Sequence, residues 1–248
     1  EVTFKFSNKT DSGFTIAHEV QLMSDGGDTA IDESFLTISG GFGKVMLGRD
    51  DGVGDNYGIA AVDLIAEETG TNGASATINT NSDIDGMSGN NDKVQYDLPA
   101  MGGFTAGVSF QDSGTNTGTD TTAYGFRYTT EAAGSSITIG GASATSEVSG
   151  GTDKDSQNLG VKIVNGNLSF AMSQGTEEAD DENQEMMGAA LSYKMGNGMT
   201  IGAYTVDGDD SLDAGEEYTA SGVEVQYTIA SGLTAVVIVE DYEYKAPT

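Results

Sequence analysis

Apolar residues recur at every second position through most of this chain. In the stretch 34–50, Leu36 and Ile38 share one face of a first arm, Val45 and Leu47 share one face of a second, and glycines join the two arms. An apolar face with a period of two on either side of a tight turn is typical of paired β-strands. The same alternation continues along the chain and predicts about fourteen strands.

The predicted connections between strands differ in length at the two ends of the sheet. Short turns such as Asn165–Gly166 and Ser231–Gly232 alternate with longer acidic loops such as 177–185 and 207–217. An up-and-down membrane barrel has this asymmetry, and it needs strands of only about 10 residues rather than the ~20 apolar residues of a membrane helix. One face of the strands carries large apolar residues, and the other carries Gly, Ser, Thr and Gln. We therefore expect an all-β, transmembrane, antiparallel up-and-down β-barrel.

One connection is far longer than the others. Residues 50–92 form about forty residues without a sustained strand pattern, and a segment of this length inside a compact domain is usually functional. Its apolar stretch, Tyr57–Ala66, predicts a short helix. Acidic residues surround that stretch: Asp50, Asp51, Asp55, Asp63, Glu67 and Glu68.

Charge and composition exclude several classes of function. The chain of 248 residues has 39 acidic and 10 basic residues and a net charge of −29. Nucleic acid is excluded as a partner because phosphate binding needs clustered Lys and Arg. The charge fits either simple solubility in a salt-rich setting or a field that concentrates cations. Because there is no cysteine and one histidine, most nucleophile–base pairs are absent, and we expect neither enzymatic activity nor a required cofactor.

Two hairpins, with the long loop between them, resemble the general diffusion porins of Gram-negative outer membranes. Residues 35–49, which end in FGKVMLGR, resemble the fourth and fifth strands of that family. Residues 93–110, with KVQYDLP and GGFTAGVSF, resemble the sixth and seventh. The segment between them lies where the family's third loop folds into the lumen and narrows it.

The resemblance implies one barrel domain over residues 1–248, with 50–92 as the pore-constricting loop. The family has sixteen strands, so we expect the first and last strands to be missing from this chain, with a fourteen-stranded barrel as the alternative. It further implies a homotrimer in the bacterial outer membrane, in contact with lipid and lipopolysaccharide. The function would be passive diffusion of ions and small hydrophilic solutes. The alternative is an acidic, calcium-binding structural or adhesive surface protein.

The polar face of the strands would line the channel. By parity this face carries basic residues at Lys5, Lys93, Arg127, Lys162 and Lys194. Arg49 corresponds to an arginine on the constriction wall of the family, and the alternative is that it anchors the loop through Asp50 or Asp51. The acidic side of the constriction would come from Asp63, Glu67 and Glu68.

The basic side of the constriction is depleted relative to the family. The positions where relatives carry basic residues hold Glu19, Gln21, Gln95 and Asp97. Since rings of wall charge set ion selectivity, this depletion and the net charge of −29 predict a preference for cations.

Two further sites follow from single residue types. His18 lies on the apolar face of strands that form the trimer contact in the family, so we expect it at the subunit interface. The loop 207–217 carries carboxylates that suit Ca²⁺, which prefers oxygen ligands. The candidate ligands at this extracellular loop are Asp207, Asp209, Asp213 and Glu217.

Overall fold

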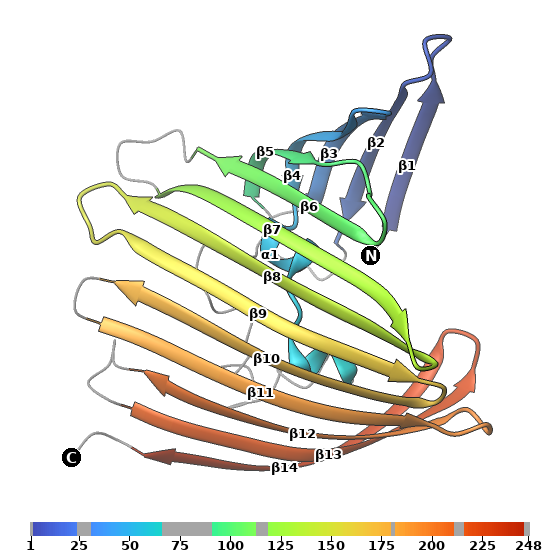
Figure 1. Ribbon diagram of the computed structural model, residues 1–248, viewed down its shortest axis with the longest axis vertical. Helices are drawn as coiled ribbons and strands as arrows, with labels where there is room; N and C mark the ends of the chain where they lie inside the picture. The colour runs from blue at the N-terminus through green and yellow to red at the C-terminus, as the bar shows by residue number, and fades with distance from the viewer. Residues whose placement is uncertain are drawn as a thin grey trace.

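The structure is a computed structural model that describes residues 2–23, 31–65, 91–112, 119–179, 182–210 and 216–245. These residues form a fourteen-stranded sheet in which each strand pairs antiparallel with the next in chain order (Figure 1). The strands are β1 (Val2–Lys9), β2 (Thr15–Leu22), β3 (Ile31–Gly40), β4 (Gly43–Asp50), β5 (Asn91–Asp97), β6 (Phe104–Gln111), β7 (Thr119–Ala132), β8 (Ser135–Val148), β9 (Lys154–Asn165), β10 (Leu168–Ala179), β11 (Glu182–Lys194), β12 (Met199–Asp210), β13 (Glu216–Ala230) and β14 (Leu233–Lys245). The predicted all-β, up-and-down fold is confirmed.

The sheet curves like the wall of a barrel but is not closed. Its outermost strands are β1 and β14, which do not pair with each other within the described residues. The segment after β4 contains a short helix, α1 (Val53–Tyr57), and a 3-10 turn, η1 (Ala61–Leu64). Both lie on the inner face of the sheet, with α1 against β6–β8 and η1 against β9–β12 (Figure 1). No helix among the described residues is long and apolar enough to cross a membrane.

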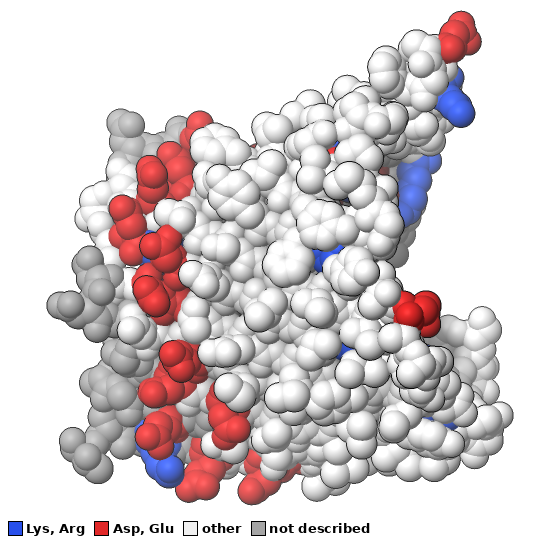
Figure 2. Space-filling view, in the orientation of Figure 1, with Lys and Arg blue, Asp and Glu red and all other residues white. Residues whose placement is uncertain are grey.

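The two faces of the sheet have opposite chemistry, as the alternation predicts. The outer face exposes large apolar side chains, for example Phe4, Val94, Leu159 and Val239. Figure 2 shows this face as a broad band with few charged side chains, and acidic side chains gather along the edge where the long connections lie. The inner face is the one that contacts α1 and η1.

The acidic loops are shorter than the sequence suggests. Strand β10 continues to Ala179 and β11 begins at Glu182, so most of the predicted loop 177–185 is paired backbone. Likewise β12 continues to Asp210 and β13 begins at Glu216. Backbone pairing needs no apolar side chains, and acidic residues are compatible with strand ends that reach beyond a membrane into water.

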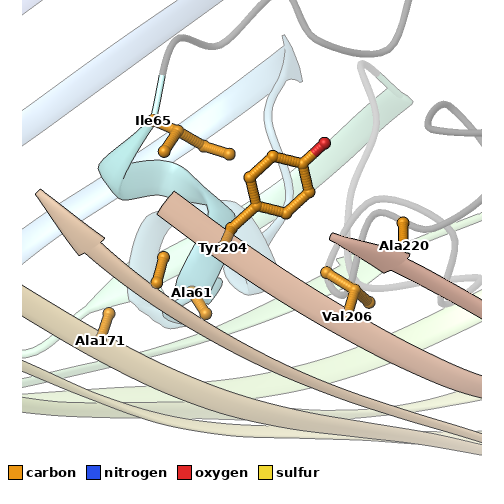
Figure 3. Packing of buried hydrophobic residues seen from close by; sticks show 7 residues of the cluster. Ala61, Ile65, Ala171, Tyr204, Val206 and Ala220 are labelled. Atoms are coloured by element: carbon orange, nitrogen blue, oxygen red, sulfur yellow. The ribbon is translucent and has the colours of Figure 1, made fainter. Parts of the chain in front are cut away.

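The short helix predicted over Tyr57–Ala66 is confirmed only in part: that stretch holds the 3-10 turn η1 (Ala61–Leu64), and an α-helix comes before it. The helix occupies Val53–Tyr57 and ends at Gly58, whose backbone is extended. Apolar residues of the inserted stretch then pack on small residues of the wall. Figure 3 shows Ala61 and Ile65 beside Tyr204, with Val206 on the same strand as Tyr204 and Ala171 and Ala220 on other strands. The apolar stretch therefore packs on the wall, and within it the Ile65 N–H donates to the Val62 carbonyl at the end of η1.

Candidate functional site

Residues 53–65, which we call the inserted segment, lie on the inner face of the sheet against glycines of the wall. A Cβ added at Gly107 on β6 would lie 2.7 Å from the ring of Tyr57, and one at Gly125 on β7 would lie 2.5 Å from Val53. A Cβ at Gly140 on β8 or Gly160 on β9 would overlap backbone oxygens of the inserted segment. We call these four residues the glycine track. Glycine permits this close approach because it has no Cβ.

Polar groups of the wall also hold the backbone of the inserted segment. The Ile59 N–H donates to Asn158 Oδ1 at 3.3 Å, and the Ala61 N–H donates to Ser173 Oγ at 2.8 Å. The Arg127 guanidinium donates to the carbonyl oxygens of Tyr57 and Gly58. The predicted pore residue Arg127 is thus on the inner face, and its charge is used to hold the inserted segment.

A buried carboxylate, Asp97, joins the helix α1 to the wall. The Tyr57 hydroxyl donates to Asp97 Oδ1 at 2.7 Å, and Gln95 Nε2 donates to the same oxygen at 2.8 Å. Lys44 Nζ lies 2.9 Å from Asp97 Oδ2. Burial, and then the bond to Asp97, raise the pKa of the Tyr57 phenol well above its usual range, so the hydroxyl remains a donor.

Replacing Tyr57 with phenylalanine should loosen the inserted segment. The change removes a hydrogen bond to a charged, buried carboxylate, and such bonds are worth about 1.5–3 kcal/mol. We expect a lower thermal-unfolding midpoint in detergent and more frequent closures in single-channel records. Tyr96→Phe is the matched control, because its hydroxyl bonds only a neutral carbonyl, that of Phe42, at an exposed site. Equal losses in the two variants would contradict this role of Tyr57.

Three carboxylates gather where the chain leaves β4. One oxygen each of Glu33, Asp50 and Asp51 lies within 4.8 Å of the others. Lys93, which is buried on the inner face, donates its ammonium group to the Asp50 carbonyl. The structure thus brings together the predicted residues Asp50, Asp51 and Lys93, and it adds Glu33, which the sequence analysis did not single out.

The remaining candidates of the inner face lie further along the wall. Lys5 pairs with Glu19 at 2.7 Å, and Gln21 Nε2 donates to Asp32 at 3.4 Å. Lys162 and Lys194 fall on the same face by register, opposite Ala171 and Thr200. Their contribution to conduction stays a prediction.

Arg49 is placed differently from the expectation. In the registers with β3 and β5 it shares the outer face with Leu47 and Val94, whereas Lys93 and Gln95 lie on the inner face. Its ion pair is with Asp92, at 3.7 Å, and not with Asp50 or Asp51. The strand register therefore does not bring Arg49 to the inserted segment.

Several predicted residues stay without a test. His18 lies on the outer face of β2 with its ring stacked on Phe6, at a centroid distance of 6.4 Å. Asp207, Asp209 and Glu217 are on adjacent strands, where Asp207 accepts from Thr219 and Glu217 pairs with Lys245. Glu67, Glu68 and Asp213 lie outside the described residues, as does the side chain of Asp63. Calcium binding at this end stays a prediction.

Sequence reasoning missed the residues that hold the inserted segment. The glycine track was visible as glycines on the polar face of successive strands, but spacing alone does not tell such a glycine from one in a flexible strand. It also missed the pair Lys154–Glu177, at 2.9 Å, in which the Glu177 side chain is only 2% exposed. That pair becomes visible only once the register of β9 and β10 is known.

Comparison with known proteins gives a consistent result. A family model described as "Gram-negative porin" matches residues 1–247. No curated protein sequence matches the chain. The anion-selective porin from Comamonas acidovorans is 18% identical, with a TM-score of 0.70, over 98% of this chain and 78% of that chain.

Two other solved structures show the same fold. A substituted porin of Rh. blastica is 17% identical with a TM-score of 0.73, over 96% of this chain and 83% of that one. A trimer form of OmpT from Vibrio cholerae is 14% identical with a TM-score of 0.64, over 98% of this chain and 86% of that one. At these identities the structural likeness establishes the fold, and the family match covers nearly the whole chain.

Proposed function

The chain belongs to the Gram-negative porin family, and from this premise we propose that it forms a cation-preferring diffusion channel that works as a homotrimer. Membership of the family makes the protein a passive channel of the bacterial outer membrane. The preference for cations and the trimer are the proposed parts. Ions and small hydrophilic solutes would pass along the inner face, beside the inserted segment.

The proposed cation preference rests on the partners that the basic side chains of the inner face have within the protein. Lys5 is paired with Glu19, Lys44 with Asp97 and Lys154 with Glu177. The charge of Arg127 is directed at carbonyl oxygens of the inserted segment. Three lysines of the wall are therefore paired with carboxylates within the protein, whereas Glu33, Asp50 and Asp51 gather three carboxylates beside one lysine. Such a wall attracts cations and repels anions.

Ion selectivity in planar bilayers tests this proposal directly. Under a tenfold gradient of potassium chloride we expect a reversal potential of the cation-selective sign, below the limit of about 59 mV for a tenfold monovalent gradient. The variant Glu33→Gln/Asp50→Asn/Asp51→Asn should shift the potential toward zero. The control Asp207→Asn removes a carboxylate from the outer face and should leave the potential unchanged. Anion selectivity of the wild-type channel would overturn the proposal. The porin from Comamonas acidovorans, which has the same fold, is described as anion-selective.

The proposed trimer draws support from the outer face of the first strands. Phe4, Phe6 and Ile16 are exposed there, and His18 stacks on Phe6. A large exposed apolar face suits either lipid or a second subunit. The OmpT structure that is described as a trimer has the same fold, and this likeness supports the proposed trimer. Mass measurement of the detergent-solubilised protein distinguishes a trimer from a monomer.

A further inference from the structure

The outer face carries an apolar groove that the channel function does not use. It has a volume of about 820 Å³ and crosses β5–β10. Small residues such as Ala106 and Gly141 form its floor, and Tyr124, Phe126 and Leu159 stand beside them. Because the register puts these side chains opposite the inner-face residues, the groove opens toward the membrane.

The groove becomes polar toward the end of the sheet that carries the long connections. Gln157 and Thr176, which are cross-strand partners, line it there. The next outer-face pair along the same two strands is Asp155 and Glu178, again direct partners. Like charges directly opposite each other on a sheet are unfavourable, so a cation between them would be stabilising.

This carboxylate pair is part of a longer row, which we call the acidic belt. Its members are exposed outer-face residues at the same end of β8–β13: Glu147, Asp155, Glu178, Glu185, Asp209 and Glu217. Figure 2 shows acidic side chains along this edge, next to the band with few charged side chains. A ligand that is apolar along the groove and positively charged at its end would complement this surface.

We propose that the groove binds one acyl chain of a membrane lipid whose headgroup carries an amine. The acyl chain lies between Phe126 and Leu159, and the amine lies at Asp155 and Glu178. A second copy of this chain is a poor occupant, because its own acidic belt would repel this one. An anionic headgroup is repelled in the same way unless a divalent cation accompanies it.

The chain contains no tryptophan, so a single introduced tryptophan gives a fluorescence signal from one known position. Leu159→Trp places a fluorophore in the wall of the groove, and the control Leu191→Trp places one on the outer face of β11, away from it. Each variant is reconstituted in phosphatidylcholine nanodiscs with a minor fraction of lipid brominated on its acyl chains. The brominated lipid carries an amine, a phosphocholine or a phosphatidylglycerol headgroup in three separate samples, and every sample contains EDTA.

We expect the amine-headed lipid to quench the fluorophore at position 159 with a two- to fivefold higher apparent association than the phosphocholine lipid, roughly the range that exposed ion pairs give. Quenching at position 191 should not depend on the headgroup. Asp155→Asn/Glu178→Gln should abolish the preference, while Asp241→Asn, on β14 and away from the groove, should keep it. Ser143→Leu, which fills the groove, should lower quenching by all three lipids.

Three results would overturn the proposal. Equal quenching by all headgroups at both positions would mean that only bulk lipid covers the groove. A preference for phosphatidylglycerol, in EDTA or restored by Ca²⁺, would assign the surface to anionic lipid. Protection of the fluorophore at position 159 from every lipid, with normal quenching at position 191, would mean that another copy of the chain covers the groove.

Discussion

Replacing Lys154 with methionine should destabilise the protein by about 3 kcal/mol, the lower part of the range for breaking a buried ion pair. Lys154 Nζ lies 2.9 Å from Glu177, and the side chains are 28% and 2% exposed. Removal of the cation leaves the carboxylate buried on the inner face. Ser156 Oγ, at 3.4 Å from Glu177, offers a long hydrogen bond that compensates weakly for the lost charge. Urea-induced unfolding in detergent micelles, followed by far-UV circular dichroism, measures the loss.

The chain contains a matched control for this substitution. Lys245 and Glu217 form a pair at 3.1 Å between neighbouring strands, but their side chains are 63% and 61% exposed. Lys245→Met should therefore leave the free energy of unfolding nearly unchanged, because exposed pairs contribute little. Restored stability in Lys154→Met/Glu177→Met would show that the uncompensated charge causes the loss. Similar losses in the two lysine variants would contradict the explanation.

Replacing Gly160 with valine should displace the inserted segment and lower single-channel conductance. A Cβ at this position overlaps the backbone oxygen of Ile59 and lies 2.7 Å from its Cβ, so the segment must move toward the lumen. Valine itself favours a strand, and a loss of stability would therefore come from the lost contact. Overpacking of this kind costs about 1–3 kcal/mol. Conductance in planar bilayers and thermal unfolding of the same sample report the two effects.

Gly196→Val is the control for a general effect of replacing glycine. A Cβ at Gly196 meets no atom within 4 Å, so the inserted segment is untouched. Conductance should stay at the wild-type value in this variant. An unchanged conductance in Gly160→Val would show that the inserted segment does not narrow the path of the ions.

The fold was predictable because β-barrel alternation is local. Each strand shows its apolar face in its own sequence, as Val94, Tyr96 and Leu98 do, and short turns follow from Gly and Asn. Strand ends were predicted less well. Residues such as Glu177 and Asp209 look like loop residues by composition, yet pairing with a neighbouring strand keeps them extended.

The site was predictable in outline only. Parity placed Lys93 and Arg127 on the inner face, but their partners are set by the path of the chain after β4. Those partners are 43 residues away for Lys93 and 69 residues away for Arg127. The placement of Arg49 shows the limit of family resemblance, because a shift of one position along a strand moves a side chain to the opposite face. The helix was misplaced for a related reason, since contacts with β6–β8 decide where it forms.

The inserted segment also has a consequence for the order in which this protein assembles. It is attached to the inner face of strands from β6 to β12, although it precedes all of them in the chain. A wall that closed first would leave its glycine track facing water, and the segment would have to thread into a finished ring. We expect docking to accompany curling of the sheet, so that the later strands pack around a segment that comes before them in the chain.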